Sequence, residues 1–224
     1  MKITFLGQAG LMLEHPGCTI LIDPYLSDSV GKRSPEKSRR VPVDEAFFDV
    51  KPDVMIFTHN HLDHYDPETV ARYIHEDSDF VVLAPSSVWN EVRLLGGKVN
   101  YVVFNRHTTW TEKGISFTAV KAEHSDPAAI GVVICDGEKK YYITGDTLYN
   151  EDIFADIPED IDVLFLPVNG VGNNMNMVDA ARFARRVSAK KVVPIHTGMM
   201  DSLSASDFPA DNKIIPEIYK EIAL

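Results

Sequence analysis

The sequence contains only two cysteines among 224 residues, Cys18 and Cys135, and they are far apart. Because there is no C-x-x-C pattern, we expect two buried thiols in a reducing compartment and not a disulfide scaffold. The sequence also lacks any apolar run of 18 residues, which argues against a transmembrane helix. Residues 1–6 enter a strand pattern directly, without the layout of a signal peptide. We therefore expect a soluble, cytoplasmic protein.

Positive charge is scarce, because 22 Lys and Arg residues face 33 Asp and Glu residues and give a formal net charge of −11. Nucleic acids and anionic membranes would repel such a chain at long range, so we expect neither as a partner. Five basic residues nevertheless fall within residues 32–40, inside a long connection at residues 24–52. This connection is either a lid that brings positive charge to an anionic substrate or a solvated charged loop. The sequence leaves both interpretations open.

The length and the 45% hydrophobic content fit a single α/β domain over residues 1–224. Three short apolar runs near the N-terminus, separated by turn residues at 7–10 and 15–17, predict an antiparallel meander. Further apolar runs predict strands at residues 54–57, 80–83, 101–104, 115–120, 141–144 and 191–195.

Helices are predicted where a capping residue precedes an apolar pattern of helical period. Asp66, Ser86 and Asn176 are such candidate caps. The helix after Asn176 has the clearest amphipathic pattern, which extends to residue 187. In residues 211–224, three isoleucines at helical spacing predict a terminal helix.

The most distinctive stretch is residues 58–64, with the sequence Thr-His-Asn-His-Leu-Asp-His, directly after a predicted buried strand. His59 and His61 are two residues apart, so in extended backbone both rings point to the same side and could bind one ion. Asp63 and His64 follow where the chain bends, so they face a different point, which suits a second ion. A polar loop of solvated histidines is the alternative. It is disfavoured because four such groups repel one another as they bind protons and gain nothing without a cation.

Three later predicted strands also lead to a potential ligand, namely His124, Asp146 and His196. In α/β proteins the carboxyl ends of strands line up along one edge, so we expect these side chains and the histidine-rich stretch to share one site. His107 has no partner at ligand spacing and is left outside. The Gly- and Asn-rich residues 170–176 could line the pocket, although helix capping already explains Asn176.

The H-x-H-x-D-H pattern of residues 59–64, followed in order by His124, Asp146 and His196, resembles the metallo-β-lactamase fold superfamily across essentially the whole chain. Asp23 in its Leu-Ile-Asp-Pro run is also similar to that family. The resemblance implies a four-layer αββα sandwich of the α/β (α+β) class, with a dinuclear metal site at the edge between its two sheets. Within the superfamily, the chain is most similar to the ascorbate-6-phosphate lactonase group.

The same resemblance implies a role for each candidate ligand. Asp23 would lie behind the ligands and orient one of the histidines. All the ligands are nitrogen or carboxylate groups, which suits two divalent metal ions, Zn²⁺ or Mn²⁺ or else Fe²⁺. The implied set is His59, His61 and His124 for the first metal, Asp63, His64 and His196 for the second, and Asp146 as the bridge.

Two such cations would lower the pKa of a shared water and supply hydroxide. The leading hypothesis is therefore a metal-dependent hydrolase that acts on a small anionic metabolite, such as an ester, lactone or phosphoester. Asp146 and Asp63 are its candidate catalytic residues, the latter assisting proton transfer. The alternatives are a phosphodiesterase or nuclease on the same fold, an iron-dependent redox enzyme and a non-catalytic metal-binding protein. The sequence does not define the oligomeric state and is compatible with a homo-oligomer.

Overall fold

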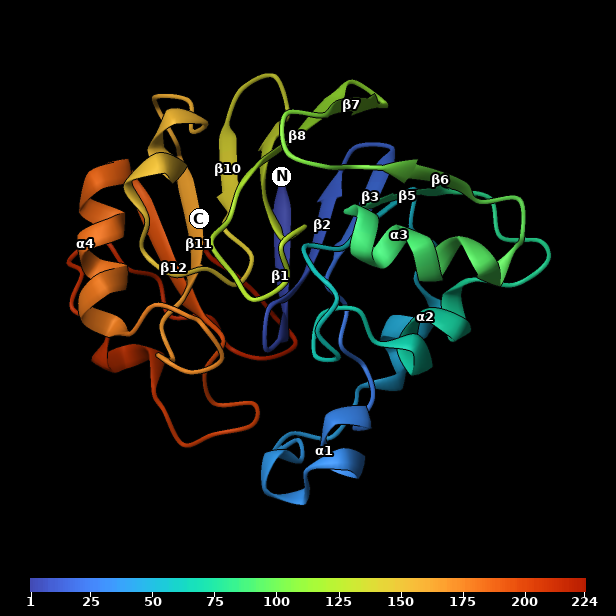
Figure 1. Cartoon of the computed structure of the whole chain (residues 1–224), viewed down its shortest axis with the longest axis horizontal. Helices are drawn as coiled ribbons and strands as arrows, with labels where there is room; N and C mark the ends of the chain where they lie inside the picture. The colour runs from blue at the N-terminus through green and yellow to red at the C-terminus, as the bar shows by residue number, and fades with distance from the viewer.

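The computed structural model describes residues 1–224 and contains two β-sheets packed face to face, as Figure 1 shows. The first sheet has the strand order β13-β1-β2-β3-β4-β5-β6, and the second has the order β12-β11-β10-β9-β8-β7. The first sheet is built from β1 (Lys2–Gly7), β2 (Gly10–His15), β3 (Cys18–Ile22), β4 (Val54–Ile56), β5 (Val81–Ala84), β6 (Asn100–Val103) and β13 (Lys220–Glu221). The second is built from β7 (Thr109–Glu112), β8 (Ile115–Lys121), β9 (Ile130–Cys135), β10 (Lys140–Ile143), β11 (Val163–Pro167) and β12 (Lys191–Ile195).

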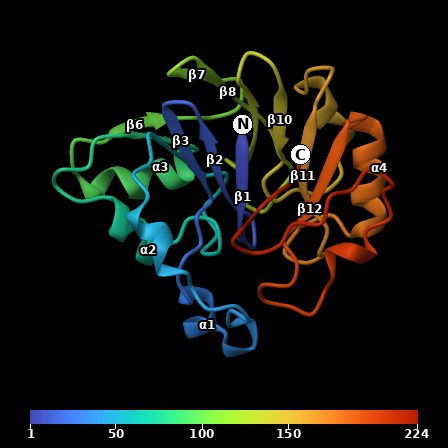
Figure 2. The same cartoon turned by 180° about the vertical axis from the view of Figure 1, so that it is seen from behind.

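Helices cover the outer faces of both sheets, and the largest apolar core lies between the sheets. Helices α2 (Pro67–Tyr73) and α3 (Ser86–Val92) bury an apolar cluster against the first sheet. Helix α4 (Met177–Val187) does the same on the second sheet, at the opposite side of the molecule in Figure 1 and Figure 2. The short helix α1 (Ser29–Arg33) projects from the lower end in these views. The predicted αββα sandwich is confirmed.

The core between the sheets draws on residues from both ends of the chain, from Ile3 to Ile222. This shared core supports our proposal that residues 1–224 form one domain. Both cysteines are free thiols, Cys18 buried and Cys135 half-buried. None of the helices combines the length and the apolarity that a membrane span requires.

Each sheet combines an antiparallel meander with a run of parallel strands. In the first sheet β3, β4, β5 and β6 are parallel, and in the second β10, β11 and β12 are parallel. The two sheets therefore share one outline, an antiparallel meander followed by parallel strands. Since parallel strands end at the same edge, this topology gathers polar residues from both sheets at one end of the sandwich.

The helix caps follow the sequence at two of the three predicted positions. The Asp66 side chain accepts hydrogen bonds from two backbone amides at the start of α2, with Pro67 at its first position. The Asn176 side chain caps α4 in the same way. The prediction for Ser86 is wrong, because α3 starts there after Pro85 and has no side-chain cap. The neighbouring hydroxyl of Ser87 donates instead to Asp126, at 2.6 Å.

The predicted terminal helix is also wrong. Residues 211–224 run mostly without regular structure and end in β13, which adds to the open edge of β1. Pro216 lacks a backbone N–H and disfavours a continuous helix through this segment. Ile222 is still buried between the sheets, because extended backbone reaches the core as well as a helix would.

Other segments differ in detail from the prediction. The connection at residues 24–52 contains α1 and two 3-10 helices, Pro35–Lys37 and Glu45–Asp49. The threonine-rich segment after His107 forms β7, which is not among the predicted strands. Strands β9 and β11 lie in the middle of the second sheet and were not among the predicted strands.

Candidate metal centre

The ends of strands from both sheets bring all seven predicted ligands together. The ligand atoms within each of two groups lie within 4.8 Å of one another. We call His59, His61, His124 and Asp146 the first group, and Asp63, His64 and His196 the second group. The rings of His59 and His64 join the two groups, with centroids 4.0 Å apart.

Asp146 lies between the groups. It follows β10, and its Oδ1 is 3.3 Å from Nε2 of His64, while its Oδ2 is 3.2 Å from Nε2 of His196. The amide of Asn174 donates to the same Oδ2, at 2.8 Å, and so fixes the carboxylate. This position between the groups is the one that a bridging ligand requires.

The glycine before Asp146 allows the two sheets to approach at this point. Gly145 has a φ of +60°, and an added Cβ would lie 2.9 Å from Cβ of Thr58 and 2.8 Å from the carbonyl oxygen of Ile130. Both contacts are closer than a side chain tolerates, so only glycine fits here without a shift of backbone.

Buried polar groups hold the second group from behind. Asp23 follows β3 and its Oδ2 lies 2.8 Å from Nδ1 of His64, which leaves Nε2 facing Asp146. The same carboxylate accepts from the backbone N–H and the hydroxyl of Thr58, at 2.8 and 2.5 Å. Asp23 therefore has the orienting position that the sequence predicts for it.

Gln8 and Asn169 also contact the second group, and no sequence pattern predicts either contact. The amide of Gln8, in the turn after β1, donates to Asp63 at 2.7 Å. The amide of Asn169 lies 2.9 Å from Nδ1 of His196, and its Oδ1 is buried without a partner. Turning this amide over would place Oδ1 where a protonated Nδ1 donates. Nε2 of His196 would then be free to bind a cation.

The first group has lighter support. Nδ1 of His59 lies 3.0 Å from the hydroxyl of Thr58, and Nδ1 of His124 lies 3.3 Å from the backbone oxygen of Asn173. Nε2 of His61 lies 3.2 Å from the hydroxyl of the exposed Ser125, so its Nδ1 faces His124. Each ring therefore has one nitrogen engaged and the other directed into the group.

The two groups also differ in the direction in which the pKa values of their histidines are shifted. Burial lowers the pKa of His59 well below its usual range and also lowers the pKa of His124. Burial opposes protonation of His64 and His196 too, but the surrounding carboxylates, above all Asp146, dominate and raise both pKa values. The pKa of His64 rises well above its usual range, and that of His196 rises to about 10. The nearby histidines in turn lower the pKa of Asp63 against its burial.

Three residues of the site adopt left-handed backbone without being glycine. Gln8, Asp23 and His196 have φ values of 54°, 42° and 64°. Such conformations are strained for residues with a side chain, and they gather where function holds them in place. The strain marks the same strand ends that carry the polar cluster.

Nε2 of His59 is buried without any hydrogen-bond partner, and Oδ1 of Asp146 has no hydrogen bond and only an ion-pair contact with His64, at 3.3 Å. Leaving a buried polar atom unpaired costs roughly 1–3 kcal/mol, so such atoms in a folded protein require an explanation. Both belong to the first group and both are metal-binding atoms in chemical type. A divalent cation supplies the missing partner, so the residues present fit the implied metal ions.

Asp126 is a further residue that the sequence analysis missed. It is buried and accepts from the backbone N–H of Asn60 at 3.1 Å and from the hydroxyl of Ser87 at 2.6 Å. It thereby ties the histidine-rich loop to helix α3 and to the segment just after His124. His107, by contrast, is exposed and contacts Asp156 at 3.1 Å, away from the cluster.

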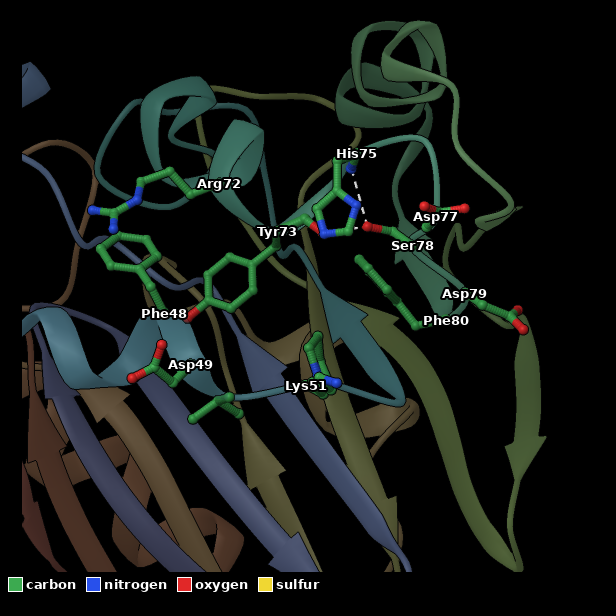
Figure 3. Close-up of a pocket in the computed structure, with 12 residues that line it drawn as sticks. Phe48, Asp49, Lys51, Arg72, Tyr73, His75, Asp77, Ser78, Asp79 and Phe80 are labelled. Atoms are coloured by element: carbon green, nitrogen blue, oxygen red, sulfur yellow. Dashed lines mark hydrogen bonds between the residues drawn. The ribbon is translucent and has the colours of Figure 1, made fainter.

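The cluster opens into a cavity of about 340 Å³ that is lined by members of both groups, including His61, Asp63, Asp146 and His196. A larger cavity of about 560 Å³ lies at the other end of β4 and β5 (Figure 3). Its lining mixes acidic and basic side chains, and Arg72 there is already paired with Glu45. It contains no group of metal ligands, so the chemistry is placed at the smaller cavity.

Known proteins are similar to this chain over most of its length. A metal-dependent hydrolase of Anoxybacillus flavithermus is 30% identical over 214 residues, which cover 88% of this chain and 85% of that protein. A metal-dependent hydrolase of Ligilactobacillus salivarius is 29% identical over 240 aligned positions, which cover 100% of each chain. The crystal structure of a possible metal-dependent hydrolase from Veillonella parvula has a TM-score of 0.82 and 18% identity, and covers 100% of this chain and 99% of that one.

A family model described as the beta-lactamase superfamily domain matches residues 18–197. This range includes every member of the first and second groups, together with Asp23 and Asn169 behind them. The chain belongs to the beta-lactamase superfamily.

Proposed function

We propose that this protein is a metal-dependent hydrolase that acts on a small anionic ester, lactone or phosphoester, with lactones as the first class to test. The observation that carries the proposal is the meeting of two ligand groups around Asp146, with two buried ligand atoms left without hydrogen-bond partners. Relatives described as metal-dependent hydrolases, similar over most of the chain, support it.

The first and second groups would each hold one divalent cation, and Asp146 would contact both. The donors are nitrogen and carboxylate atoms, and neither cysteine belongs to the groups. This donor set suits Zn²⁺ or Mn²⁺, with Fe²⁺ as a third choice. When bound, two such ions lower the pKa of water toward neutrality and polarise a carbonyl or phosphoryl oxygen.

The protein's own residues would position the reactants and move protons. Asp63 lines the cavity and is partly exposed, whereas Asp146 is buried. Neighbouring histidines lower the pKa of Asp63 despite its burial, so its carboxylate is ionised and can accept a hydrogen bond from water in the cavity. The amide of Gln8 holds this carboxylate in place, at 2.7 Å. A lowered pKa makes the carboxylate a weak base, so Asp63 is the candidate that positions water and assists proton transfer, and Asp146 is the residue that spans both groups.

The size of the cavity favours a small substrate. At about 340 Å³ it is near the lower end of the range for ligand pockets, which is roughly 300–1,000 Å³. The chain's net charge of −11 opposes binding of nucleic acid, whose phosphates it would repel. A small metabolite is thus a better candidate than a polymer.

The test is an activity screen on protein loaded separately with Zn²⁺, Mn²⁺ or Fe²⁺. Lactones, carboxylic esters, phosphate monoesters and phosphodiesters would be offered as substrates, and metal content would be measured in the same samples. We expect hydrolysis of at least one class, lost on treatment with a chelator and restored by metal.

A matched pair of variants gives the control. His61→Ala removes a candidate ligand, whereas His75→Ala removes an exposed histidine at the other cavity. We expect His61→Ala to lose activity and metal together, and His75→Ala to keep both. A fully metal-loaded protein that hydrolyses nothing in the panel would contradict the proposal and favour a non-catalytic metal-binding role.

A further inference from the structure

The basic residues at 32–40 are not equivalent. Lys32 forms an ion pair with Glu68, at 2.6 Å. Arg39 donates to the backbone oxygen of Tyr25, and Arg40 donates to the backbone oxygen of Asp201. Lys37 forms no ion pair or hydrogen bond through its side chain, yet it lines the cavity of the candidate metal centre. It is the only Lys or Arg among the residues that line this cavity.

The backbone next to Lys37 is hydrogen-bonded to two different parts of the protein, so Lys37 does not lie on a free loop. Arg39 donates to Tyr25 and to the hydroxyl of Tyr219, at 2.7 and 2.5 Å, and its backbone N–H donates to Asp28 at 2.9 Å. The backbone N–H of Arg40 donates to the oxygen of Met199, at 2.8 Å. The segment is thereby tied both to the chain after β3 and to the loop after His196.

The rest of the cavity wall adds apolar surface near Lys37. Val30, Val171 and Met200 line the cavity together with the polar residues of the two groups. Asp201 is the acidic residue that lines the wall outside the two groups, and its Oδ1 accepts from the backbone N–H groups of Gly198 and Leu203, both at 2.9 Å. This carboxylate therefore stabilises its own turn, and it forms no ion pair with Lys37.

We propose that Lys37 forms an anion subsite at the rim of this cavity, which binds a carboxylate or phosphate of the substrate that is separate from the bond to be cleaved. The apolar residues of the wall would contact the segment that joins the two ends of the substrate. This inference rests on the proposed function, and it narrows the substrate class to molecules with an anionic group remote from the scissile ester or lactone.

The physical reason is the electrostatic setting of the lysine. In a protein with a net charge of −11, most basic side chains find a carboxylate or a carbonyl, as Lys32, Arg39 and Arg40 do. Arg33 has no such partner, but it does not line this cavity. An unpaired ammonium that lines a substrate cavity gains a partner only when an anion enters. A charge-assisted hydrogen bond at the rim of a cavity is stronger than a fully exposed ion pair, which water and salt screen. We therefore expect an effect of about tenfold.

The experiment compares two esters of equal length, 4-nitrophenyl hydrogen succinate, which carries a free carboxylate, and 4-nitrophenyl butyrate, which is neutral. The measured quantity is the ratio of their kcat/KM values on the metal-loaded protein. We expect Lys37→Met to lower this ratio about tenfold, mainly through KM for the succinate ester, and Lys37→Arg to keep it within about threefold. Added salt should lower the ratio for the wild type and not for Lys37→Met.

Lys32→Met is the matched control, because Lys32 lies five residues away and is paired with Glu68, outside this cavity. It should leave the ratio unchanged. An unchanged ratio in Lys37→Met, or an equal loss for both esters, would overturn the anion subsite while leaving the hydrolase proposal intact.

A binding measurement separates the two proposals if the wild type cleaves neither ester. Calorimetry with the stable amides succinanilic acid, which is anionic, and butyranilide, which is neutral, needs no turnover. Preferential binding of the anionic amide that is lost in Lys37→Met would support the subsite even though the hydrolase proposal had failed for esters. Equal binding of succinanilic acid to the wild type and to Lys37→Met would overturn the subsite.

Discussion

The two groups of the candidate metal centre differ in how firmly the protein itself holds them. The second group is buried around His64 and His196 and is backed by the carboxylate of Asp23 and the amides of Gln8 and Asn169. The histidines of the first group are backed only by hydroxyls and one backbone oxygen, and His61 and His124 are half-buried.

The charge balance follows the same division. Carboxylates, above all Asp146, raise the pKa of both histidines in the second group, so Asp146 and Asp63 compensate the positive charge of these rings without a metal. In the first group, burial lowers the pKa of His59 and His124, and the buried atoms without a hydrogen bond are found there. The second group is thus stable as it stands, whereas the first gains most from a cation.

The largest effect on turnover is expected when Asp146 is replaced. Its carboxylate belongs to the first group and contacts the histidines of the second, so its loss should affect both groups alike. Asp146→Ala should lower turnover by at least about 1,000-fold, since bound metal ions contribute several kcal/mol to catalysis. The measurement is kcat/KM on the best substrate of the panel, with metal content in parallel. A kcat/KM value of Asp146→Ala within tenfold of the wild type would contradict the proposal that Asp146 serves both groups.

The next largest difference between the groups is expected in the free energy of unfolding of the chelator-treated protein. His196→Ala removes one of the two cationic rings beside the carboxylates of Asp63 and Asp146 and leaves only His64 to compensate them, a change that costs about 3 kcal/mol. His61→Ala removes a half-buried ring and should cost clearly less. Urea unfolding of both variants measures this difference. Equal losses would mean that the groups are held alike.

Variants of residues that contact the ligands should change metal affinity by a smaller amount, and more in the second group than in the first. Asp23→Asn keeps the shape but weakens the contact with His64, and should lower metal affinity by about 10- to 100-fold. Ser125→Ala removes an exposed hydroxyl beside His61 and should lower it by less than about threefold. Competition with a coloured chelator gives both affinities. If Ser125→Ala lowered metal affinity more than Asp23→Asn, the first group would be the one that the protein holds more firmly, which would contradict our account.

The smallest expected effect is on the pH dependence of stability in the metal-free protein. The contributions of the two groups to the free energy of unfolding should change with pH in opposite directions. Carboxylates raise the pKa of His196 to about 10, so its contribution to stability is complete below a pH of about 6.5 and is lost as pH rises through about 10. Burial lowers the pKa of His124, so its contribution is complete above about 6.5 and is lost as pH falls.

The free energy of unfolding of each glutamine variant, compared with the wild type, measures these contributions. The difference for His196→Gln should shrink from pH 6.5 to pH 10. The difference for His124→Gln should shrink from pH 6.5 downward. The same slope for both variants would show that the two groups do not differ in charge.

The sequence could predict the layers of the fold and the gathering of the seven candidate ligands for a simple physical reason. Each ligand follows a short apolar strand, and the carboxyl ends of parallel strands meet at one edge. The crowding of His59, His61, Asp63 and His64 in six positions has no other ready explanation. These signals are local, so they can be read without knowing how the sheets pair.

Gln8, Asn169 and Asp126 could not be found in that way. Each is one polar residue in a turn, and turns commonly contain such residues. Their contacts with Asp63, His196 and the backbone of Asn60 exist only after the two sheets have packed. The position of Lys37 at the cavity depends likewise on the long-range ties of Arg39 and Arg40.

The wrong predictions have a related cause. The isoleucines of residues 211–224 do bury apolar surface, but Pro216 and the open edge of β1 favour extended backbone over a helix. Apolar spacing indicates which residues are buried, and it does not by itself decide between a helix and an extended segment that reaches the same core.

Elemental analysis of purified protein, after loading with Zn²⁺ or Mn²⁺ and removal of excess metal, tests the central claim most directly. We expect two ions per chain in the wild type and in His75→Ala, and fewer than one in Asp146→Ala. Two ions per chain in Asp146→Ala, or none in the wild type, would contradict a paired metal centre built around this residue.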